Sequence, residues 1–388
     1  MVEEHERRAW IAIASVRDIG PDRHYELIAR FGPATSVIEA AVAGHVRTWV
    51  AKERQIRRGP VIPDTALGEL EHLPSTIDGR LAEIEDQRLW TRTPLDLDYP
   101  TRLTELDPAP PVIHGWGDRA LLDAPRSVAV VGTRRPTPSG RLLAGRIAAR
   151  LVEWDAVVVS GVAVGIDGAA HASTLAHNGK TVGVIGGGHR FPGPRAHAAL
   201  RSQIVDSGGA LISEHHPSIE PTRGTYPRRN RIIAGLGDAT VVVEAPSKSG
   251  ALITARIAME LGRLTLVAPG RIGEWATAGC LRLLRDSPAR PLIGIDEMVA
   301  DLGFDGTAGV SRPATTALSA SDAIASLGAA ERTVAERLRR APAGLDVLVD
   351  DTGLAPSVVS GAVTLLLLRG WIQAIGPAFL PAGPLLVG

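Results

Sequence analysis

The stretch Ser127-Val-Ala-Val-Val-Gly132 is short, apolar, largely β-branched, and ends in glycine. Runs of this kind are typical of a strand buried on both faces of a parallel sheet. An amphipathic stretch from Gly140 to Trp154 follows and predicts a helix, and a second buried run, Ala156-Val-Val-Val-Ser160, comes after it. Strand, helix and strand in this order form the repeating unit of a doubly wound α/β sheet.

The same alternation continues along the chain. Further apolar runs predict strands at 181–186, 210–213, 240–244 and 264–268, and the intervening segments predict helices at 165–177, 195–206, 229–236 and 251–261. We therefore expect a Rossmann-like, doubly wound, mostly parallel sheet over residues 86–302.

The first 85 residues predict a helical domain. Helix, Gly20-Pro21 hairpin and helix follow one another, which is the outline of a helix-hairpin-helix or SAM-like module. Such hairpins can bind DNA phosphates, but a simple helical bundle without that role is the favoured interpretation, because Asp18 and Asp22 beside the hairpin would repel phosphate. Residues 60–80 have no clear pattern and predict no element.

The end of the chain predicts a winged helix. Residues 303–322 are rich in Gly, Ala, Ser, Thr and Pro and predict a linker. Residues 323–388 then predict helices at 331–340, 345–351 and 357–369 and a hairpin at 371–375 and 378–380. Arg369 is the only charge on the third helix and no amide side chain is present there, so we do not expect this domain to be the main site for a polyanion.

Composition narrows the classes of function. Lys plus Arg and Asp plus Glu both number 42, which excludes a globally basic surface, so any polyanion site must be local. The single cysteine, Cys280, excludes an intrachain disulfide and a cysteine-built metal site. The polar N-terminus and the lack of an apolar run of membrane-spanning length predict a soluble, cytoplasmic protein that does not use a membrane.

The segment from 221 to 237 is strongly basic and contains no carboxylate. It holds Tyr226 and Asn230 together with four arginines: Arg223, Arg228, Arg229 and Arg231. Guanidinium groups match phosphate oxygens, an aromatic ring can stack on a base, and a helix N-terminus favours an anion. The alternative is a solvated basic helix start.

Small or phosphate-compatible residues also follow the other predicted strands. In open α/β sheets the carboxyl ends of the strands form the site. The candidates there are Gly132, Thr133, Arg134, Ser160, Gly161, Gly165, Asp167, Gly187, Ser249, Gly250 and Thr254. Each has an ordinary alternative as a turn or helix cap, but together they favour a phosphate-binding edge.

Catalytic and metal sites are poorly supported. His215 and His216 beside Glu214 could bind a cation, but a solvated pair on a loop is the favoured interpretation. There is no Ser/His/Asp arrangement with an oxyanion signal. We expect no catalytic residue, no metal and no cofactor.

Eight motifs occur in an order that resembles the bacterial DNA-processing protein family DprA, also called Smf. They are Gly132-Thr-Arg, Ser160-Gly-Val-Ala-Val-Gly-Ile-Asp167 with His171, Phe191-Pro192, Ser213-Glu214 with Pro217, Tyr226-Pro-Arg-Arg-Asn-Arg-Ile-Ile-Ala-Gly-Leu236, Val242-Val-Glu244, Ser249-Gly-Ala-Leu-Ile-Thr-Ala255 and Ala268-Pro-Gly270. The resemblance covers residues 99–302.

This resemblance implies single-stranded DNA binding, loading of the recombinase RecA in natural transformation, self-association into a dimer, and no known catalytic step. It implies that Arg134 and Arg223 hold phosphates, that Tyr226 stacks on a base, and that Arg228 to Arg231 line the same pocket. Three positions depart from the family pattern, Val164, Arg195 and Leu281, and they put the affinity in doubt more than the class of function.

An enzyme is the alternative. Nucleotide hydrolases of the LOG phosphoribohydrolase type also place glycines and a glutamate at strand ends, and Glu244 could act as a base. Their Pro-Gly-Gly-x-Gly-Thr loop is replaced here by Ser249-Gly-Ala-Leu-Ile-Thr. The arginine-rich segment suits a polymer better than a mononucleotide, so the DNA-binding interpretation is favoured.

Overall fold

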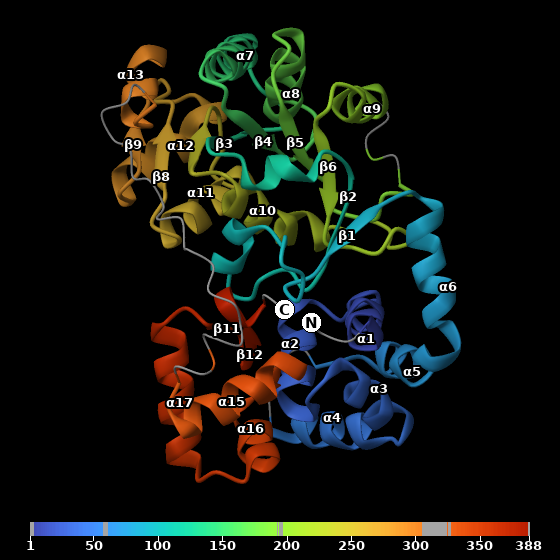
Figure 1. Ribbon diagram of the computed structural model, residues 1–388. Coiled ribbons are helices and arrows are strands. Elements are labelled where there is room, and N and C mark those ends of the chain that lie inside the picture. The colour runs from blue at the N-terminus through green and yellow to red at the C-terminus, as the bar shows by residue number, and fades with distance from the viewer. Residues whose placement is uncertain are drawn as a thin grey trace.

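A nine-stranded sheet is the centre of the computed structural model, which describes residues 4–56, 61–191, 193, 197–304, 324 and 327–386 (Figure 1). The strand order is β1-β2-β6-β5-β4-β3-β7-β8-β9, parallel from β6 to β9 with β1 and β2 antiparallel at one edge. The strands are β1 (Trp90–Arg92), β2 (Ile113–Gly117), β3 (Ser127–Val131), β4 (Val157–Ser160), β5 (Thr181–Val184), β6 (Ala210–Ser213), β7 (Ala239–Val242), β8 (Leu264–Val267) and β9 (Arg290–Pro291). The predicted Rossmann-like, mostly parallel sheet is confirmed.

Helices cover both faces of this sheet (Figure 1). Val128 and Val130 of β3 pack against α7 (Pro138–Glu153) and α8 (Ile166–Ala176), whereas Ala129 and Val131 face α10 (Thr225–Leu236) and α11 (Ala251–Glu260). Successive strand side chains point to opposite faces, so a wholly apolar strand needs a layer of helices on each side. The remaining helices of this part are α9 (Ala198–Asp206), α12 (Ala278–Asp286) and α13 (Ile295–Asp301).

The order of the strands reverses between β3 and β7. From β3 the chain continues outward through β4, β5 and β6, and it then returns to the other side of β3 for β7 and β8. Open α/β sheets bind ligands in the crevice beyond the carboxyl ends of the strands at such a switch point. The fold therefore places the residues after Val131 and after Val242 at the expected site.

The N-terminal part is helical. Its helices are α1 (Glu4–Ala14), α2 (Pro21–Phe31), α3 (Ala34–Val42), α4 (His45–Ile56), α5 (Asp64–Glu71) and α6 (Leu73–Asp86). The last two occupy the segment for which the sequence predicted no element. Pro63 precedes α5 and Pro74 lies in the first turn of α6, where a missing N–H is tolerated, so these prolines mark helix starts.

The C-terminal part is a winged helix, as predicted. It contains α15 (Ala329–Arg340), α16 (Leu345–Thr352) and α17 (Pro356–Leu368), and a small sheet of β10 (Ala343–Gly344), β12 (Ala378–Pro381) and β11 (Ile372–Ile375). Ile375, Ala378 and Leu380 of the hairpin are buried in one cluster with Tyr25 and Ile28 of α2. The hairpin thus packs on the N-terminal helices. Most of the predicted linker, 303–322, lies outside the described residues.

The helices of the described ranges fall short of a membrane span. No single helix there is long and apolar enough to cross a membrane. The pair α16 and α17 meets the criteria of length and composition only when taken together, and the two helices are bent by 117°.

Candidate nucleic-acid interface

A groove of about 860 Å³ lies at the switch point, beyond the carboxyl ends of β3 and β7. We call it the switch-point groove. Its walls come from the loops after these strands and from the first turns of α10 and α11. It collects eleven of the predicted site residues: Gly132, Thr133, Arg134, Asp167, Arg223, Tyr226, Arg229, Asn230, Ser249, Gly250 and Thr254.

The groove carries a surplus of positive charge. Four exposed cations line it, Arg134, Arg135, Arg223 and Lys248, and none of them pairs with a carboxylate in the described part of the chain. Asp167, which also lines the groove, is only 6% exposed, and its carboxylate accepts a hydrogen bond from Gly161 N. Free cations around a concave surface attract a polyanion although the whole molecule is neutral.

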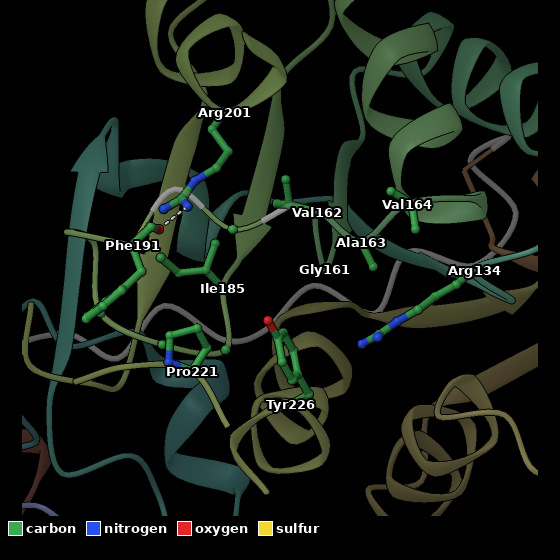
Figure 2. A pocket seen from close by; sticks show the side chains of 14 residues that line it. Arg134, Gly161, Val162, Ala163, Val164, Ile185, Phe191, Arg201, Pro221 and Tyr226 are labelled. Carbon is green, nitrogen blue, oxygen red and sulfur yellow. Dashed lines mark hydrogen bonds between the residues drawn. The ribbon is translucent and has the colours of Figure 1, made fainter. Parts of the chain in front are cut away.

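A smaller pocket opens beside Tyr226, and we call it the side pocket (Figure 2). Gly161 and Gly187, both predicted site residues, line it together with Phe191, Arg201 and Tyr226. The Tyr226 ring packs on the glycine loop after β5, and a Cβ at Gly186 would lie 2.8 Å from its Cδ1. Arg134 borders both the groove and the side pocket, and its Cζ lies 5.1 Å from the centroid of the Tyr226 ring.

Arg229 lines the groove but is almost completely buried. It is 5% exposed, donates a hydrogen bond of 3.0 Å to Val184 O, and lies 3.9 Å from Asp167 Oδ2. Burial raises the pKa of Asp167 and lowers the pKa of Arg229, and each charge partly offsets the shift of the other. A Cβ at Gly161 would lie 1.4 Å from Arg229 Nη1, so only glycine fits beside the guanidinium.

Two other predicted residues support the groove from behind. The hydroxyl of Ser160 is buried and donates to Val130 O at 2.6 Å, so it ties β4 to β3. Gly165 has a φ of 99°, and a Cβ there would lie 2.3 Å from Thr133 O. The glycine thus lets the loop that carries Arg134 pass close to the start of α8.

Arg228 and Arg231 point away from the groove. Helix α10 begins at Thr225, four residues before the predicted start at 229, so its neighbouring arginines leave the helix in different directions. Arg228 lies against Gly20 in a cavity that Glu214 and Glu220 also line. Arg231 forms an ion pair with Glu214 and donates to Pro108 O at 2.8 Å.

The three departures from the family pattern have different surroundings. Val164 lines the side pocket, so a missing charge at this position bears directly on the site. Leu281 lies in α12 and lines neither the groove nor the side pocket. Arg195 lies outside the described residues.

The residues considered as a catalytic base or as metal ligands make hydrogen bonds within the protein. Glu244 is 5% exposed and its carboxylate accepts hydrogen bonds from the backbone N and the hydroxyl of Thr137, which precedes α7. His216 contacts Arg80 O through Nε2 and the Ser218 hydroxyl through Nδ1. Within the described ranges no three His, Cys, Asp or Glu side chains are grouped so as to hold a metal ion.

Three exposed residues of the groove lie outside the list of predicted site residues, although the two arginines after the first strand, Arg134 and Arg135, were both expected to be able to clamp a phosphate. Arg135 and Lys248 lie at strand ends beside predicted site residues, and their exposure adds them to the positive wall. Trp275 also lines the groove, from the loop after β8. Its position at the carboxyl end of a parallel strand was a usable signal, because that edge carries the site.

Comparisons with known proteins identify the family of this chain. The family DNA recombination-mediator protein A matches residues 90–303, and the DprA winged helix domain matches residues 318–376. A putative DNA processing protein DprA of Mycobacterium tuberculosis is 41% identical over 264 residues, which are 68% of this chain and 66% of that protein. The chain thus spans slightly less than two thirds of that relative. The DNA processing protein DprA of Bacillus subtilis is 35% identical over 56% of this chain and 73% of its own length.

Two solved structures of DNA processing protein A are similar to the structure of this chain. DNA processing protein A of Streptococcus pneumoniae matches with a TM-score of 0.59 and 28% identity, over 78% of this chain and 99% of that chain. The Helicobacter pylori protein, whose structure was described for its single-stranded DNA binding mode, matches with a TM-score of 0.51 and 29% identity, over 56% of this chain and 97% of that chain. From its sequence, its fold and these matches, the chain belongs to the DNA recombination-mediator protein A family, also called DprA or Smf.

Proposed function

We propose that this protein is a single-stranded DNA-binding recombination mediator whose strand lies in the switch-point groove. One observation carries the proposal: four exposed cations without carboxylate partners among the described residues surround a groove that also contains the Tyr226 ring. Arg134, Arg223 and Lys248 would neutralise phosphates, and Tyr226 would stack on a base. The described binding mode of the H. pylori relative supports the same ligand.

Single strands fit this site better than duplex DNA. A base must present a face to Tyr226, and a paired, stacked base inside a duplex cannot do so. Asn230 is the one amide side chain among the described residues that line the groove, which therefore lacks a row of amides to read base edges. We therefore expect tight binding with little dependence on sequence.

We further propose that residues 86–302 form the DNA-binding domain, flanked by a helical domain at 1–85, a linker at 303–322 and the winged helix at 323–388. Membership in a recombination-mediator family supports loading of RecA onto the bound strand in natural transformation, and self-association into a dimer. These steps would take place in the cytoplasm. RecA loading can be measured as ATP hydrolysis by RecA on strands coated with single-strand-binding protein, with and without this chain.

The central experiment is a titration of labelled oligonucleotides, single-stranded and duplex, at several salt concentrations. We expect tighter binding of the single strand at every salt concentration and weaker binding in Arg223→Ala. Arg228→Ala is the matched control, because this exposed arginine of the same segment lies in another cavity. Equal affinity for both forms of DNA, or equal effects of the two substitutions, would contradict the proposal.

Hydrolysis of nucleoside monophosphates is the competing function. Its expected base, Glu244, is bound to Thr137 and does not line the switch-point groove. Incubation with nucleoside monophosphates, followed by chromatography for released base, tests this alternative directly. Release that disappears in Glu244→Gln would favour the enzyme.

A further inference from the structure

Trp275 differs from the other tryptophans of the chain in its exposure. Its side chain is 64% exposed, whereas Trp10 is fully buried and the remaining five are partly buried. A single exposed apolar residue is common on protein surfaces and needs no explanation by itself. The place of this one matters, because Trp275 lines the switch-point groove together with the four cations.

The backbone that follows Trp275 is packed on the sheet. Ala276 and Thr277, which follow it, are buried, and Gly279 N donates a hydrogen bond of 2.8 Å to Ala245 O after β7. Thr277 packs so closely on Gly270 that a Cβ there would lie 2.0 Å from it. The exposed indole is therefore presented from a fixed support at the edge of the sheet.

The groove has aromatic rings from two separate elements. Tyr226 lies in the first turn of α10 on the side of the side pocket, and Trp275 begins the short helix at Trp275–Thr277 after β8. Trp275 does not line the side pocket, so the two rings belong to different parts of the groove. Exposed Lys248 also lines the groove, from the loop after β7.

We propose that Trp275 is a second base-stacking platform, so that the bound single strand extends across the switch point from Tyr226 to the loop after β8. This inference rests on the proposed DNA-binding function and deepens it. Stacking on an aromatic ring tolerates every base, and an indole anchored by the buried residues after it loses little freedom when a base covers it. Cations beside the rings would hold the intervening phosphates.

The test compares Trp275→Ala, Trp275→Phe and Ile272→Ala by titration with oligonucleotides of increasing length. Trp275→Ala should lose roughly 5- to 150-fold in affinity for long oligonucleotides, the range expected for one stacked base. It should lose less for a mononucleotide or dinucleotide, which can fill the Tyr226 end alone. The salt dependence should not change because no charge is removed.

Trp275→Phe keeps a stacking face and should recover most of the affinity. Indole fluorescence gives an independent readout, since DNA should quench the wild type more strongly than Trp275→Phe at saturation. Ile272→Ala is the matched control: this residue is 96% exposed in the same loop but has no ring and does not line the groove. It should bind DNA like the wild type.

Three results would overturn the inference. They are unchanged affinity of Trp275→Ala for long oligonucleotides, identical quenching in the wild type and Trp275→Phe, or a parallel loss in Trp275→Ala and Ile272→Ala with a changed sedimentation coefficient. The last result would mean that the loop contacts a second copy of the chain. If the wild type itself binds no single strand, the proposed function fails, and that outcome is distinct from the others.

Discussion

The guanidinium of Arg134 lies over the ring of Tyr226, with its Cζ 5.1 Å from the ring centroid. Figure 2 shows the two side chains approaching each other from the loop after β3 and from α10. An arginine over an aromatic face is attracted by the electrons of the ring and is oriented by it. The proposed phosphate-binding group and the proposed stacking group are therefore in contact at the border of the groove.

A double-mutant cycle measures whether this contact couples the two side chains in binding. Arg134→Ala and Tyr226→Ala should each weaken binding of single-stranded DNA, and the double variant should lose less than the sum. Residues in contact typically show interaction energies of about 0.5–3 kcal/mol. The measurement is the dissociation constant of one oligonucleotide for all four proteins at one salt concentration. Additive losses would mean that the two side chains act independently.

The salt dependence of binding distinguishes the cations of the groove from arginines elsewhere in the same segment. Arg223→Ala and Lys248→Ala should each flatten the log–log plot of affinity against salt by about 0.7 for each phosphate that is no longer neutralised. Arg228→Ala should leave the slope unchanged, because its side chain lies against Gly20 rather than in the groove. An unchanged slope in the first two variants, or a flatter slope in the third, would contradict the placement.

Arg229→Ala should act on stability. Its removal leaves Asp167 buried without its nearest cation and also removes the hydrogen bond to Val184 O. Breaking a buried pair by removing one partner typically costs about 3–5 kcal/mol. We expect a loss of this size in the free energy of unfolding, measured by urea denaturation.

Asp167→Asn provides the control for this interpretation. Combined with Arg229→Ala, it removes the unpaired buried charge and should restore part of the lost stability. The opposite pattern, a normal unfolding midpoint for Arg229→Ala with a flatter salt dependence, would place this guanidinium on the DNA.

The sequence predicted the strands of the sheet more accurately than it predicted where the arginine side chains of α10 lie. Strand β6 has its predicted bounds, 210–213, because an apolar run between turn residues defines a buried strand almost alone. The positions of the Arg228, Arg229 and Arg231 side chains depend on the direction in which each leaves α10 and on the residues that pack against that side of the helix. Glu214 and the hairpin at Gly20 come from distant parts of the chain. Such contacts have no signature in a local pattern.

Trp275 was missed for a different reason, because its place after a parallel strand was a signal that its residue type obscured. A tryptophan is usually interpreted as part of a core, and periodicity gives no reason to treat this one otherwise. Its exposure follows from the loop after β8, where the neighbouring Ala276 and Thr277 fill the interior. The α5–α6 region was missed because Pro63 and Pro74 are common in loops as well as at helix starts.

His24 should make the stability of the protein depend on pH. It is fully buried between Trp10 and Tyr25, and burial lowers its pKa from 6.5 to about 3. Between these two values the unfolded chain binds one proton more than the folded chain. The free energy of unfolding should therefore fall as the pH falls, by up to about 1.4 kcal/mol per pH unit for this group.

His24→Leu tests the assignment because it removes the titrating ring but keeps an apolar side chain in place. The plot of unfolding free energy against pH, measured with urea between pH 7 and pH 4, should become flatter by one proton. The same slope in both proteins would show that His24 is not a source of the acid sensitivity.

Helix α17 should not be a reader of duplex DNA. The third helix of a winged helix is the one that enters a major groove, where base edges are recognised by Arg, Lys, Asn or Gln. The exposed face of α17 instead presents Ser357, Ser360, Thr364, Leu365 and Leu368. The adjoining hairpin, which could otherwise contact the DNA backbone, packs on α2.

The test introduces two glutamates on this face by substitution. Removing the whole C-terminal domain is not suitable, because it would expose the apolar surface of α2 that the hairpin covers. Ser357→Glu combined with Thr364→Glu should leave the affinities for duplex and single-stranded DNA within a few-fold of the wild type. If α17 lay in a groove, the new charges would face phosphates and repel them. Lys248→Glu in the switch-point groove is the positive control and should weaken single-strand binding. A loss of more than tenfold in the α17 variant, about 1.4 kcal/mol, would show that the winged helix does hold DNA.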